Sequence, residues 1–482
     1  MAKMYENFGL FIDGEWRQAR SGRTIDVIDP ATEERLGVIP HAGAEDLDAA
    51  LKAASGAAKS WANTPGWERT RILRAIADGL RGHVEEAALM MTRESGKPLA
   101  EARGEFGAAI DQFDWYAHEA RRIFGHTLGA RDPGARLDVQ YRPVGPVAAF
   151  TAWNFPALLP ARKMAAALAA GCTIVLKPSE ETPSNAFLFA EAARHAGLPK
   201  GVLGVVTGDP TEISRYLIAS PVIRKVSLTG SVPVGKLIMK LCADGLKRLS
   251  LELGGHAPVL VFPDADPVSA GKACAAAKFR NSGQVCISPT RFYVHASIKD
   301  AFAEAMAESA QALKQGIGLD PSVTCGPMIN ARGRERVETL VQDAVQRGAR
   351  VLAGGGRPAA FNRGFFFEPT VLDNVPEDAR IMREEPFGPV APIATFDSYD
   401  EVIARANDTP FGLAGYVFSK SVEFANRAAS ALEVGMVGVN DMMLAAAEIP
   451  FGGVKESGFG REGGQLGILD YLEPQYVKFR YN

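Results

Sequence analysis

The chain has 482 residues, of which 47% are hydrophobic and 23% are charged, with a formal net charge of -3 at pH 7. These values are typical of a globular protein of two or three domains, and they exclude the basic excess that nucleic-acid binding requires. No stretch approaches the roughly 18 consecutive apolar residues of a membrane span, and MAKMYENFGLFIDGEW lacks the apolar core of a secretory signal. We therefore expect a cytoplasmic protein that binds neither nucleic acid nor membrane.

The first part of the chain is predicted to be helical. Hydrophobic residues recur at helical spacing in 45–63, 67–95 and 97–124, which predicts three amphipathic helices that could cover a sheet. Residues 137–142 (LDVQYR) have the pattern of a strand. Because this strand lies between the helices and the first sheet strand, we expect it to belong elsewhere.

Between residues 147 and 254, strands and helices alternate. This alternation is typical of a parallel, doubly wound α/β sheet, which binds ligands beyond the carboxyl ends of its strands. Strands are predicted at 147–151, 173–177, 202–207, 225–229 and 248–253, and helices at 160–170, 184–197, 211–220 and 230–241. The residues at the carboxyl ends are Trp153, Asn154, Lys177 to Glu180, Gly208, Gly230, Ser231 and Glu252.

The second half of the chain predicts another domain. A further set of helices and strands runs from 265 to 435. At the C-terminus, YVKFRY (476–481) has the pattern of a short strand without a partner nearby. We expect that strand to pair with LDVQYR or with another subunit.

The cysteines favour neither disulfides nor a metal site, because their number is odd and no CxxC pair occurs. Cys286 lies in FRNSGQVCIS (279–288), among polar and turn-forming residues. A buried structural cysteine would instead usually have apolar neighbours. We therefore take Cys286 as a candidate nucleophile. The others are expected to be small buried hydrophobic residues: Cys172, Cys242, Cys274 and Cys325.

The ordinary dinucleotide-binding fingerprint GxGxxG is absent. The candidate for phosphate binding is SLTGSVPVG (227–235), where Gly230 and Ser231 open a helix. Free N–H groups at a helix N-terminus favour a pyrophosphate. Glycine at a strand-to-helix turn is routine, so this motif alone does not establish a site.

Five motifs together resemble the aldehyde dehydrogenase superfamily, nearly end to end. They are WNFP (153–156), LELGG (251–255), GQVC (283–286), EEPFGPV (384–390) and PFGGVKESGFGREGG (450–464). The resemblance implies an α/β fold with two doubly wound parallel-sheet domains, a small β oligomerisation element, and a homodimer or homotetramer. The implied parts are an NAD-binding domain (1–124 and 147–254), a catalytic domain (255–446) and oligomerisation strands (125–146 and 467–482).

The resemblance implies covalent catalysis. Oxidising an aldehyde by hydride transfer first requires a tetrahedral adduct, which Cys286 would form as a thiohemiacetal that becomes a thioester. The Asn154 amide and the Cys286 backbone N–H would stabilise the oxyanion. Glu252 matches the family's general base for thioester hydrolysis. Singly, each of these residues would be read as structural; the accompanying motifs reverse that interpretation.

The resemblance also implies a nicotinamide cofactor. Lys177 and Glu180 match residues that hold the adenosine ribose, and a carboxylate near the 2′ position repels a 2′-phosphate. NAD is therefore favoured, and NADP is the less favoured alternative. Glu385 and Phe387 match positions that contact the nicotinamide ribose and ring. The remaining cofactor-binding candidates are Trp153, Ser179, Gly208, Gly230, Ser231, Val234 and Leu253.

Two arginines indicate the substrate: Arg162, eight residues after Asn154, and Arg280, six before Cys286. Succinate-semialdehyde dehydrogenases have arginines at both matching positions, where they hold the distal carboxylate. A pair of planar guanidinium groups suits that role, although either arginine could instead form a surface ion pair. We expect a small aldehyde with a distal carboxylate, with oxidation of succinate semialdehyde to succinate preferred.

The sequence departs from that subfamily near Ala445. The subfamily has a serine ahead of PFGG, whereas this chain reads NDMMLAAAEIPFGG (440–453). One carboxylate contact is then missing, and Met442, Met443 and Leu444 would form an apolar wall that suits a longer or differently substituted substrate. Glutarate semialdehyde, 2-oxoglutarate semialdehyde and general aliphatic or aromatic aldehydes therefore remain alternatives.

Two other classes of protein remain open. A CoA-acylating dehydrogenase would transfer the acyl group to CoA, but such relatives usually lack the glutamate of LELGG, so Glu252 argues against it. A non-enzymatic structural protein on the same fold would have no need for an intact cysteine, asparagine and glutamate.

Overall fold

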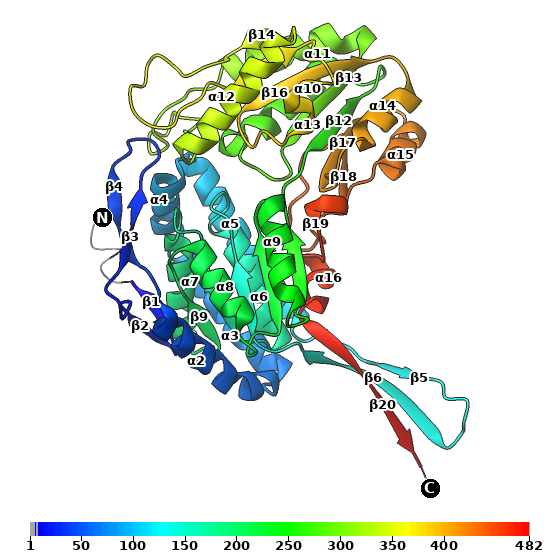
Figure 1. The fold of residues 1–482 in the computed structure, drawn as a ribbon. Coiled ribbons are helices and arrows are strands. Elements are labelled where there is room, and N and C mark those ends of the chain that lie inside the picture. Colours follow the sequence, from blue (N-terminus) through cyan, green and yellow to red (C-terminus); the bar gives the residue numbers. More distant parts are fainter. Residues whose placement is uncertain (1–4, 6–7, 482) are drawn as a thin grey trace.

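The structure is a computed structural model that describes residues 5 and 8–481. Two α/β lobes lie one above the other, and a β arm projects from the lower lobe (Figure 1). Residues 1–4, 6, 7 and 482 lie outside the described residues. The expectations for segments 1–124 and 467–482, and for the stretch searched for a secretory signal, include some of these residues. Within the described ranges, no helix is both long and apolar enough to cross a membrane.

The first sheet lies in the lower lobe, with strand order β19-β11-β10-β7-β8-β9-β1-β2 in the described chain. Its strands are β1 (Leu10–Ile12), β2 (Glu15–Arg17), β7 (Val147–Phe150), β8 (Ile174–Lys177), β9 (Leu203–Val205), β10 (Lys225–Thr229), β11 (Arg248–Glu252) and β19 (Gly458–Phe459). The strands predicted between residues 147 and 254 are confirmed, and all run parallel. The antiparallel edges β1, β2 and β19 were not predicted.

Both faces of this sheet are buried. Val147 and Ala149 of β7 belong to one apolar cluster with helices α3 to α7, whereas Ala148 and Phe150 belong to another with α2, α8 and α9. Successive side chains of a strand point to opposite faces, so the sheet is covered by helices on both sides. The helices are α2 (Ala44–Ala62), α3 (Gly66–Arg81), α4 (Val84–Ser95), α5 (Leu99–Glu119), α6 (Leu158–Ala170), α7 (Ser184–His195), α8 (Pro210–Ala219) and α9 (Val232–Ala243).

The prediction of one helix over residues 67–95 was wrong. Two helices, α3 and α4, occupy that stretch, and the chain leaves helical geometry between them. Gly82 ends α3, and His83 has φ -112° and ψ 12°. Glycine in a helix costs about 1 kcal/mol relative to alanine, so the break falls where the helix is weakest. The helix predicted at 97–124 begins and ends earlier, as α5 spans Leu99–Glu119.

The second sheet lies in the upper lobe, with strand order β14-β15-β16-β13-β12-β17-β18 within the described residues. Its strands are parallel apart from β14. They are β12 (Ala257–Val261), β13 (Pro289–His295), β14 (Arg350–Ala353), β15 (Thr370–Asp373), β16 (Val390–Phe396), β17 (Ala414–Phe418) and β18 (Met436–Val439). The helices beside them are α10 (Pro267–Phe279), η1 (Arg280–Gly283), η2 (Ala296–Ile298), α11 (Lys299–Gln311), α12 (Ala331–Gln346), α13 (Arg380–Arg383), α14 (Tyr399–Asn407) and α15 (Val422–Ala431).

The arm contains the C-terminal strand. Strand β20 (Leu472–Arg480) pairs antiparallel with β6 (Ala135–Pro143) along its whole length, and β5 (His126–Leu128) pairs with the other edge of β6. The predicted pairing of the C-terminal strand with LDVQYR is therefore confirmed. The remaining elements are the hairpin β3 (Thr24–Ile28) with β4 (Arg35–Pro40), η3 (Lys455–Ser457) and α16 (Gly464–Leu469).

Glu94 of α4 gives the fold a pH-dependent contact. Its carboxylate is 1% exposed and accepts hydrogen bonds from the Ser184 N–H at 3.3 Å and hydroxyl at 2.7 Å, at the start of α7. Burial raises the pKa of Glu94 to about 7. An unfolded glutamate has a pKa of about 4.3, so between roughly pH 4.5 and 7 the folded chain holds a proton that the unfolded chain has released. Stability therefore falls as pH rises through that range.

We expect the melting temperature of the wild type to fall relative to that of Glu94→Gln between pH 5 and pH 8. The change should be a few degrees, equivalent to about 2 kcal/mol, because glutamine does not titrate. Differential scanning calorimetry at fixed ionic strength measures it. Exposed Glu304, replaced by glutamine, is the matched control. A difference between wild type and Glu94→Gln that does not change with pH would contradict the prediction.

Candidate active site

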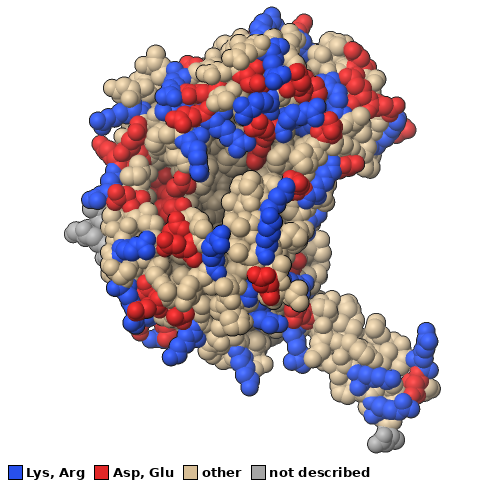
Figure 2. All heavy atoms as spheres, viewed as in Figure 1, with Lys and Arg blue, Asp and Glu red and all other residues tan. Residues whose placement is uncertain are grey.

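The predicted site residues lie where the two lobes meet. In Figure 2 the surface is hollowed between the upper and lower lobes, with acidic and basic side chains on the rim. Three loops carry Trp153, Asn154, Arg280, Cys286, Glu385 and Phe387: 151–157 before α6, 280–288 before β13, and 384–389 before β16. The loops are joined directly, because the Asn154 side chain in the lower lobe donates a hydrogen bond to the Gln284 carbonyl in the upper lobe at 3.0 Å.

The loop that carries Cys286 has an unusual backbone. Asn281, Ser282 and Gly283 have φ values of +48°, +53° and +72°, three left-handed residues in a row. A β carbon at Gly283 would lie 2.1 Å from the carbonyl oxygen of Gly388, so only glycine fits there. Non-glycine residues held in this conformation cost about 1–3 kcal/mol each and cluster at functional sites. Cys286 is partly exposed, while the other cysteines are buried.

Asn154 is fixed on both its side chain and its backbone. Its amide donates to the Gln284 carbonyl, a bond that uses one of the two amide hydrogens. Its own carbonyl accepts from Lys97 Nζ at 2.8 Å and from Asn281 Nδ2 at 3.0 Å. The side chain is 4% exposed. Such an amide could offer its remaining hydrogen to a substrate oxygen near Cys286, and the assignment as an oxyanion donor stays a prediction.

The surroundings of Cys286 favour the neutral thiol. Burial raises the pKa of the Cys286 thiol to about 12, with further contributions from the charges of Glu385 and Glu252. The Arg162 guanidinium opposes this shift. The structure thus brings the predicted nucleophile, the predicted base and one predicted substrate arginine within electrostatic reach of each other.

Glu252 lies at the carboxyl end of β11 and is 4% exposed. Neither of its carboxylate oxygens has a hydrogen-bond partner among the described residues. Burial and the charge of Glu462 raise its pKa well above the ordinary value, against the opposing charges of Lys163 and Arg162. An unpartnered carboxyl with a raised pKa is suited to general-base chemistry, because it can bind a water and accept its proton.

A buried ion pair beside Glu252 was not predicted from the sequence. Lys163, which is 0% exposed, pairs with Glu462 and also donates to the Ser227 hydroxyl at 2.9 Å. One signal was present: a lysine in the alanine-rich helix 160–170, where a buried charge needs a partner. No local signal identifies that partner, which lies 299 residues away.

The predicted cofactor residues lie mostly along the carboxyl edge of the first sheet. Lys177 Nζ and the Glu180 carboxylate form an ion pair after β8, and Gly230 N–H donates to the Glu252 carbonyl at 3.0 Å. Ser231 is the N-cap residue that precedes α9, and its side chain makes no capping hydrogen bond. The others lie as follows: Ser179 is buried, Gly208 has φ +146° beside His41, Val234 is exposed on α9, and Leu253 packs against Gly235.

Two further residues predicted to bind the cofactor, Glu385 and Phe387, lie in the upper lobe. Glu385 accepts a hydrogen bond from Gly255 N–H at 3.0 Å, and burial raises its pKa to about 7. The Phe387 ring meets the Trp153 ring edge-to-face at 5.6 Å. The uncapped helix start of α9, the ribose-binding candidates after β8 and this carboxylate fit a dinucleotide that extends from the first sheet toward Cys286.

The two predicted substrate arginines stack on aromatic rings. Arg162 lies 4.3 Å from the Phe451 ring centroid and is 2% exposed, and its Nε has no hydrogen-bond partner in the described part of the chain. Arg280 lies 5.4 Å from the Phe155 ring centroid. Ala445 packs against the core of the upper lobe together with Met442, Leu444, Phe155 and Cys286. Arg162 also lies within electrostatic reach of Cys286 and Glu252, and Arg280 within that of Glu101.

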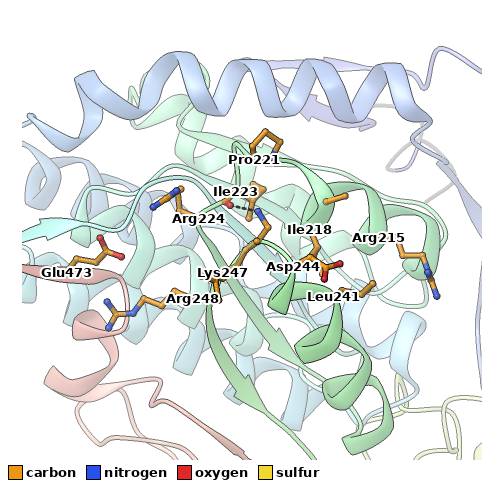
Figure 3. Close-up of a pocket in the computed structure, with 13 residues that line it drawn as sticks. Arg215, Ile218, Pro221, Ile223, Arg224, Leu241, Asp244, Lys247, Arg248 and Glu473 are labelled. Carbon is orange, nitrogen blue, oxygen red and sulfur yellow. Dashed lines mark hydrogen bonds between the residues drawn. The ribbon is translucent and has the colours of Figure 1, made fainter.

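A separate cavity of about 570 Å³ lies at the amino ends of β10 and β11, far from Glu252 at the carboxyl end (Figure 3). Its basic side chains either form hydrogen bonds with the protein itself or point away from one another. Lys247 Nζ donates to the carbonyls of Ser220 and Ile223, both at 2.8 Å, while Arg215 and Arg224 extend in opposite directions. None of the predicted site residues lines this cavity.

Fold and site together define an oxidoreductase that acts on aldehydes with NAD(P). The sequence profile of the aldehyde dehydrogenase family matches residues 16–477. The chain therefore belongs to the aldehyde dehydrogenase family, and the resemblance noted from its motifs is confirmed.

Its similarity to individual members extends over nearly the whole chain. The NADP(+) succinate-semialdehyde dehydrogenase GabD of Escherichia coli (strain K12) is 45% identical over 466 residues, covering 97% of this chain and 96% of that protein. A glutarate-semialdehyde dehydrogenase of Pseudomonas putida is 44% identical over 467 residues, with coverage of 97% and 96%. The crystal structure of succinate-semialdehyde dehydrogenase from Burkholderia pseudomallei superposes with a TM-score of 0.96, at 45% identity and 98% coverage of both chains.

We expect iodoacetamide to label Cys286 alone in the free enzyme, because the other cysteines are buried. With a thiol pKa of about 12, the labelling rate should rise about tenfold per pH unit from pH 7 to pH 10, following the thiolate fraction. Mass spectrometry of timed samples measures site and rate, with Cys286→Ala as the control. A rate that levels off below pH 9 would contradict the expected burial effect.

Proposed function

We propose that this aldehyde dehydrogenase oxidises ω-oxo acids, with conversion of succinate semialdehyde to succinate preferred. The observation that carries the proposal is the pair Arg162 and Arg280, each stacked on an aromatic ring beside the site. A guanidinium that lies over the face of a ring still has N–H groups free for a carboxylate. Similarity to enzymes named for succinate and glutarate semialdehyde supports the same class of substrate.

The proposed chemistry assigns a role to each catalytic residue. Cys286 gives its proton to solvent and adds to the aldehyde as the thiolate, which forms a thiohemiacetal. Its oxyanion is stabilised by the free amide hydrogen of Asn154 and the Cys286 backbone N–H. Bound NAD(P) supplies the hydride acceptor. Glu252 takes a proton from the water that hydrolyses the resulting thioester, releasing the carboxylic acid and the Cys286 thiol.

The residues around Ala445 support a substrate longer than succinate semialdehyde as an alternative. Alanine offers no hydrogen bond to a carboxylate, and Met442 and Leu444 beside it are apolar and partly buried. Because methionine adapts its shape to its neighbours, this wall suits a chain longer than succinate semialdehyde. Glutarate semialdehyde is therefore the second candidate substrate, ahead of 2-oxoglutarate semialdehyde and uncharged aldehydes.

The proposal also covers the cellular location and the oligomeric state of the protein. We propose a cytoplasmic homodimer or homotetramer in which the arm of β5, β6 and β20 joins another copy. Tyr476 and Tyr481, each 59% exposed, and Phe479, 38% exposed, give the arm an aromatic surface that favours such a contact.

We expect kcat/KM for succinate semialdehyde to exceed that for butanal, which has the same number of carbon atoms, by at least about tenfold, because a guanidinium contact to a charged group contributes about 1.5 kcal/mol or more. In Arg280→Met this ratio should fall toward one, while kcat/KM for butanal stays within a few-fold of wild type. Steady-state NADH formation measures both.

Arg427→Met is the matched control, since Arg427 stacks on the Tyr399 ring at 4.0 Å on the α14 and α15 side of the upper lobe. Equal rates with both aldehydes in the wild type would leave the dehydrogenase assignment intact and would disprove the carboxylate clamp. Glutarate semialdehyde, tested in parallel, distinguishes the two candidate acids.

We expect NAD to be preferred over NADP because the Glu180 carboxylate, paired with Lys177, would lie near the 2′ position of the adenosine ribose. Glu180→Ser should reduce the ratio of kcat/KM for NAD to that for NADP by about tenfold or more, since it removes a like charge facing the 2′-phosphate. The neighbouring Glu181→Ser serves as the control, because Glu181 bonds instead to Asn330. A ratio that is unchanged in Glu180→Ser would refute this role.

A further inference from the structure

One buried cation touches the backbone of Asn154. Lys97 Nζ lies 2.8 Å from the Asn154 carbonyl oxygen, in the link between α4 and α5, and Lys97 is 2% exposed. The second donor to the same oxygen is Asn281 Nδ2, at 3.0 Å. A carbonyl oxygen has two lone pairs, so both are occupied and the orientation of the Asn154 peptide is fixed.

The same cation is bound to the chain just beyond Asn154. Lys97 pairs with Glu105 of α5, and the nitrogen lies 4.6 Å from the Phe155 ring centroid. The other oxygen of Glu105 accepts hydrogen bonds from the N–H groups of Ala157 at 2.8 Å and Leu158 at 3.2 Å. Lys97 and Glu105 therefore hold the chain from the Asn154 carbonyl to Leu158, directly after the Asn154 side chain.

A third residue of this set reaches the cysteine loop. Glu101, half-buried, accepts a hydrogen bond from Asn281 N–H at 2.8 Å. Lys97, Glu101 and Glu105 are spaced four residues apart, so Glu101 and Glu105 lie on one face of α5 with Lys97 just before it. This face supports the Asn154 loop and the Cys286 loop together, and it sets the distance between them.

We propose that Lys97 is a positioning residue for aldehyde oxidation, which holds the Asn154 amide where the oxyanion of the Cys286 adduct forms. The proposal rests on the proposed role of Asn154. Oxyanion donors act only when they are held within about 0.5 Å of the productive position, and they bind the tetrahedral state more tightly than the aldehyde. Loss of Lys97 should therefore lower kcat and leave substrate and cofactor binding nearly unchanged.

The test is a double-mutant cycle between Lys97→Met and Asn154→Ala. Removing one oxyanion donor lowers kcat by about 10²–10³-fold, and we expect Lys97→Met to lower it by about tenfold to a hundredfold. In the Asn154→Ala background, Lys97→Met should change kcat by less than about threefold, because the group it positions is already gone. KM for the aldehyde and the dissociation constant for NAD, measured by fluorescence, should stay within about threefold of wild type.

The matched control is Lys225→Met. Lys225 is likewise buried, at 0% exposed, and it lies over an aromatic ring, that of Tyr471. It donates to the Ser250 hydroxyl at 2.9 Å. It begins β10, at the end of the sheet away from Cys286. Lys225→Met should lower the melting temperature as Lys97→Met does, with kcat of the folded enzyme retained.

Glu105→Gln is a second variant in case Lys97→Met does not fold. It keeps an acceptor for Ala157 N–H but removes the charge that holds Lys97. We expect a smaller loss of kcat, which again disappears in the Asn154→Ala background. Losses that multiply in either cycle, or an unchanged kcat in both single variants, would overturn the proposal. If Asn154→Ala alone keeps full kcat, the proposed role of Asn154 fails first, and the single variants then show whether Lys97 affects kcat by another route.

Discussion

The hydrogen bond from the Asn154 side chain to the Gln284 carbonyl joins the two lobes between the loops that carry the proposed catalytic residues Asn154 and Cys286. Each lobe has its own sheet and apolar core, so the position of one lobe relative to the other depends on what lies between them. Buried polar groups left without partners cost about 1–3 kcal/mol each, so a junction made of satisfied donors and acceptors has one preferred geometry. The left-handed turn at Asn281 to Gly283 fits within that geometry, because its carbonyls and side chains supply the partners.

Around this junction, buried charge is divided between paired and unpaired groups. Lys163 with Glu462 and Lys97 with Glu105 form closed pairs, which reduces the several kcal/mol that burial of each ion costs. Glu252, by contrast, has no hydrogen-bond partner in the described chain. Among these groups, the unpaired carboxyl of Glu252 is the one that we propose as the general base. The stability lost at Glu252 is offset by the burial of two large α/β cores.

The local hydrophobic pattern predicted most of the helices and strands. Elements that depend on partners distant in the sequence could not be predicted. The strands between residues 147 and 254 were predictable because each is a short apolar run between helices of clear periodicity. The break between α3 and α4 was missed, since residues on both sides of Gly82 and His83 continue the same apolar spacing. Strand β19 has two residues, too few for any periodicity, and it forms only because β11 offers an edge. In the site, motifs identified Cys286, Glu252 and Asn154, but not Lys97 or Glu462, whose meaning depends on partners remote in the sequence.

The path of the C-terminal segment has a consequence for synthesis of the protein. Residues 458–459 form an edge of the sheet that begins near residue 10, Glu462 pairs with Lys163, and β20 pairs with β6 (Figure 1). While the ribosome is still adding the upper lobe, the lower lobe therefore has an open sheet edge, an unpaired buried lysine and an arm without its edge strand β20. Contacts between distant segments form slowly and leave such surfaces exposed in the meantime. The nascent chain would need protection by chaperones until its last few dozen residues emerge, and truncation from the C-terminus would damage the part of the enzyme that is made first.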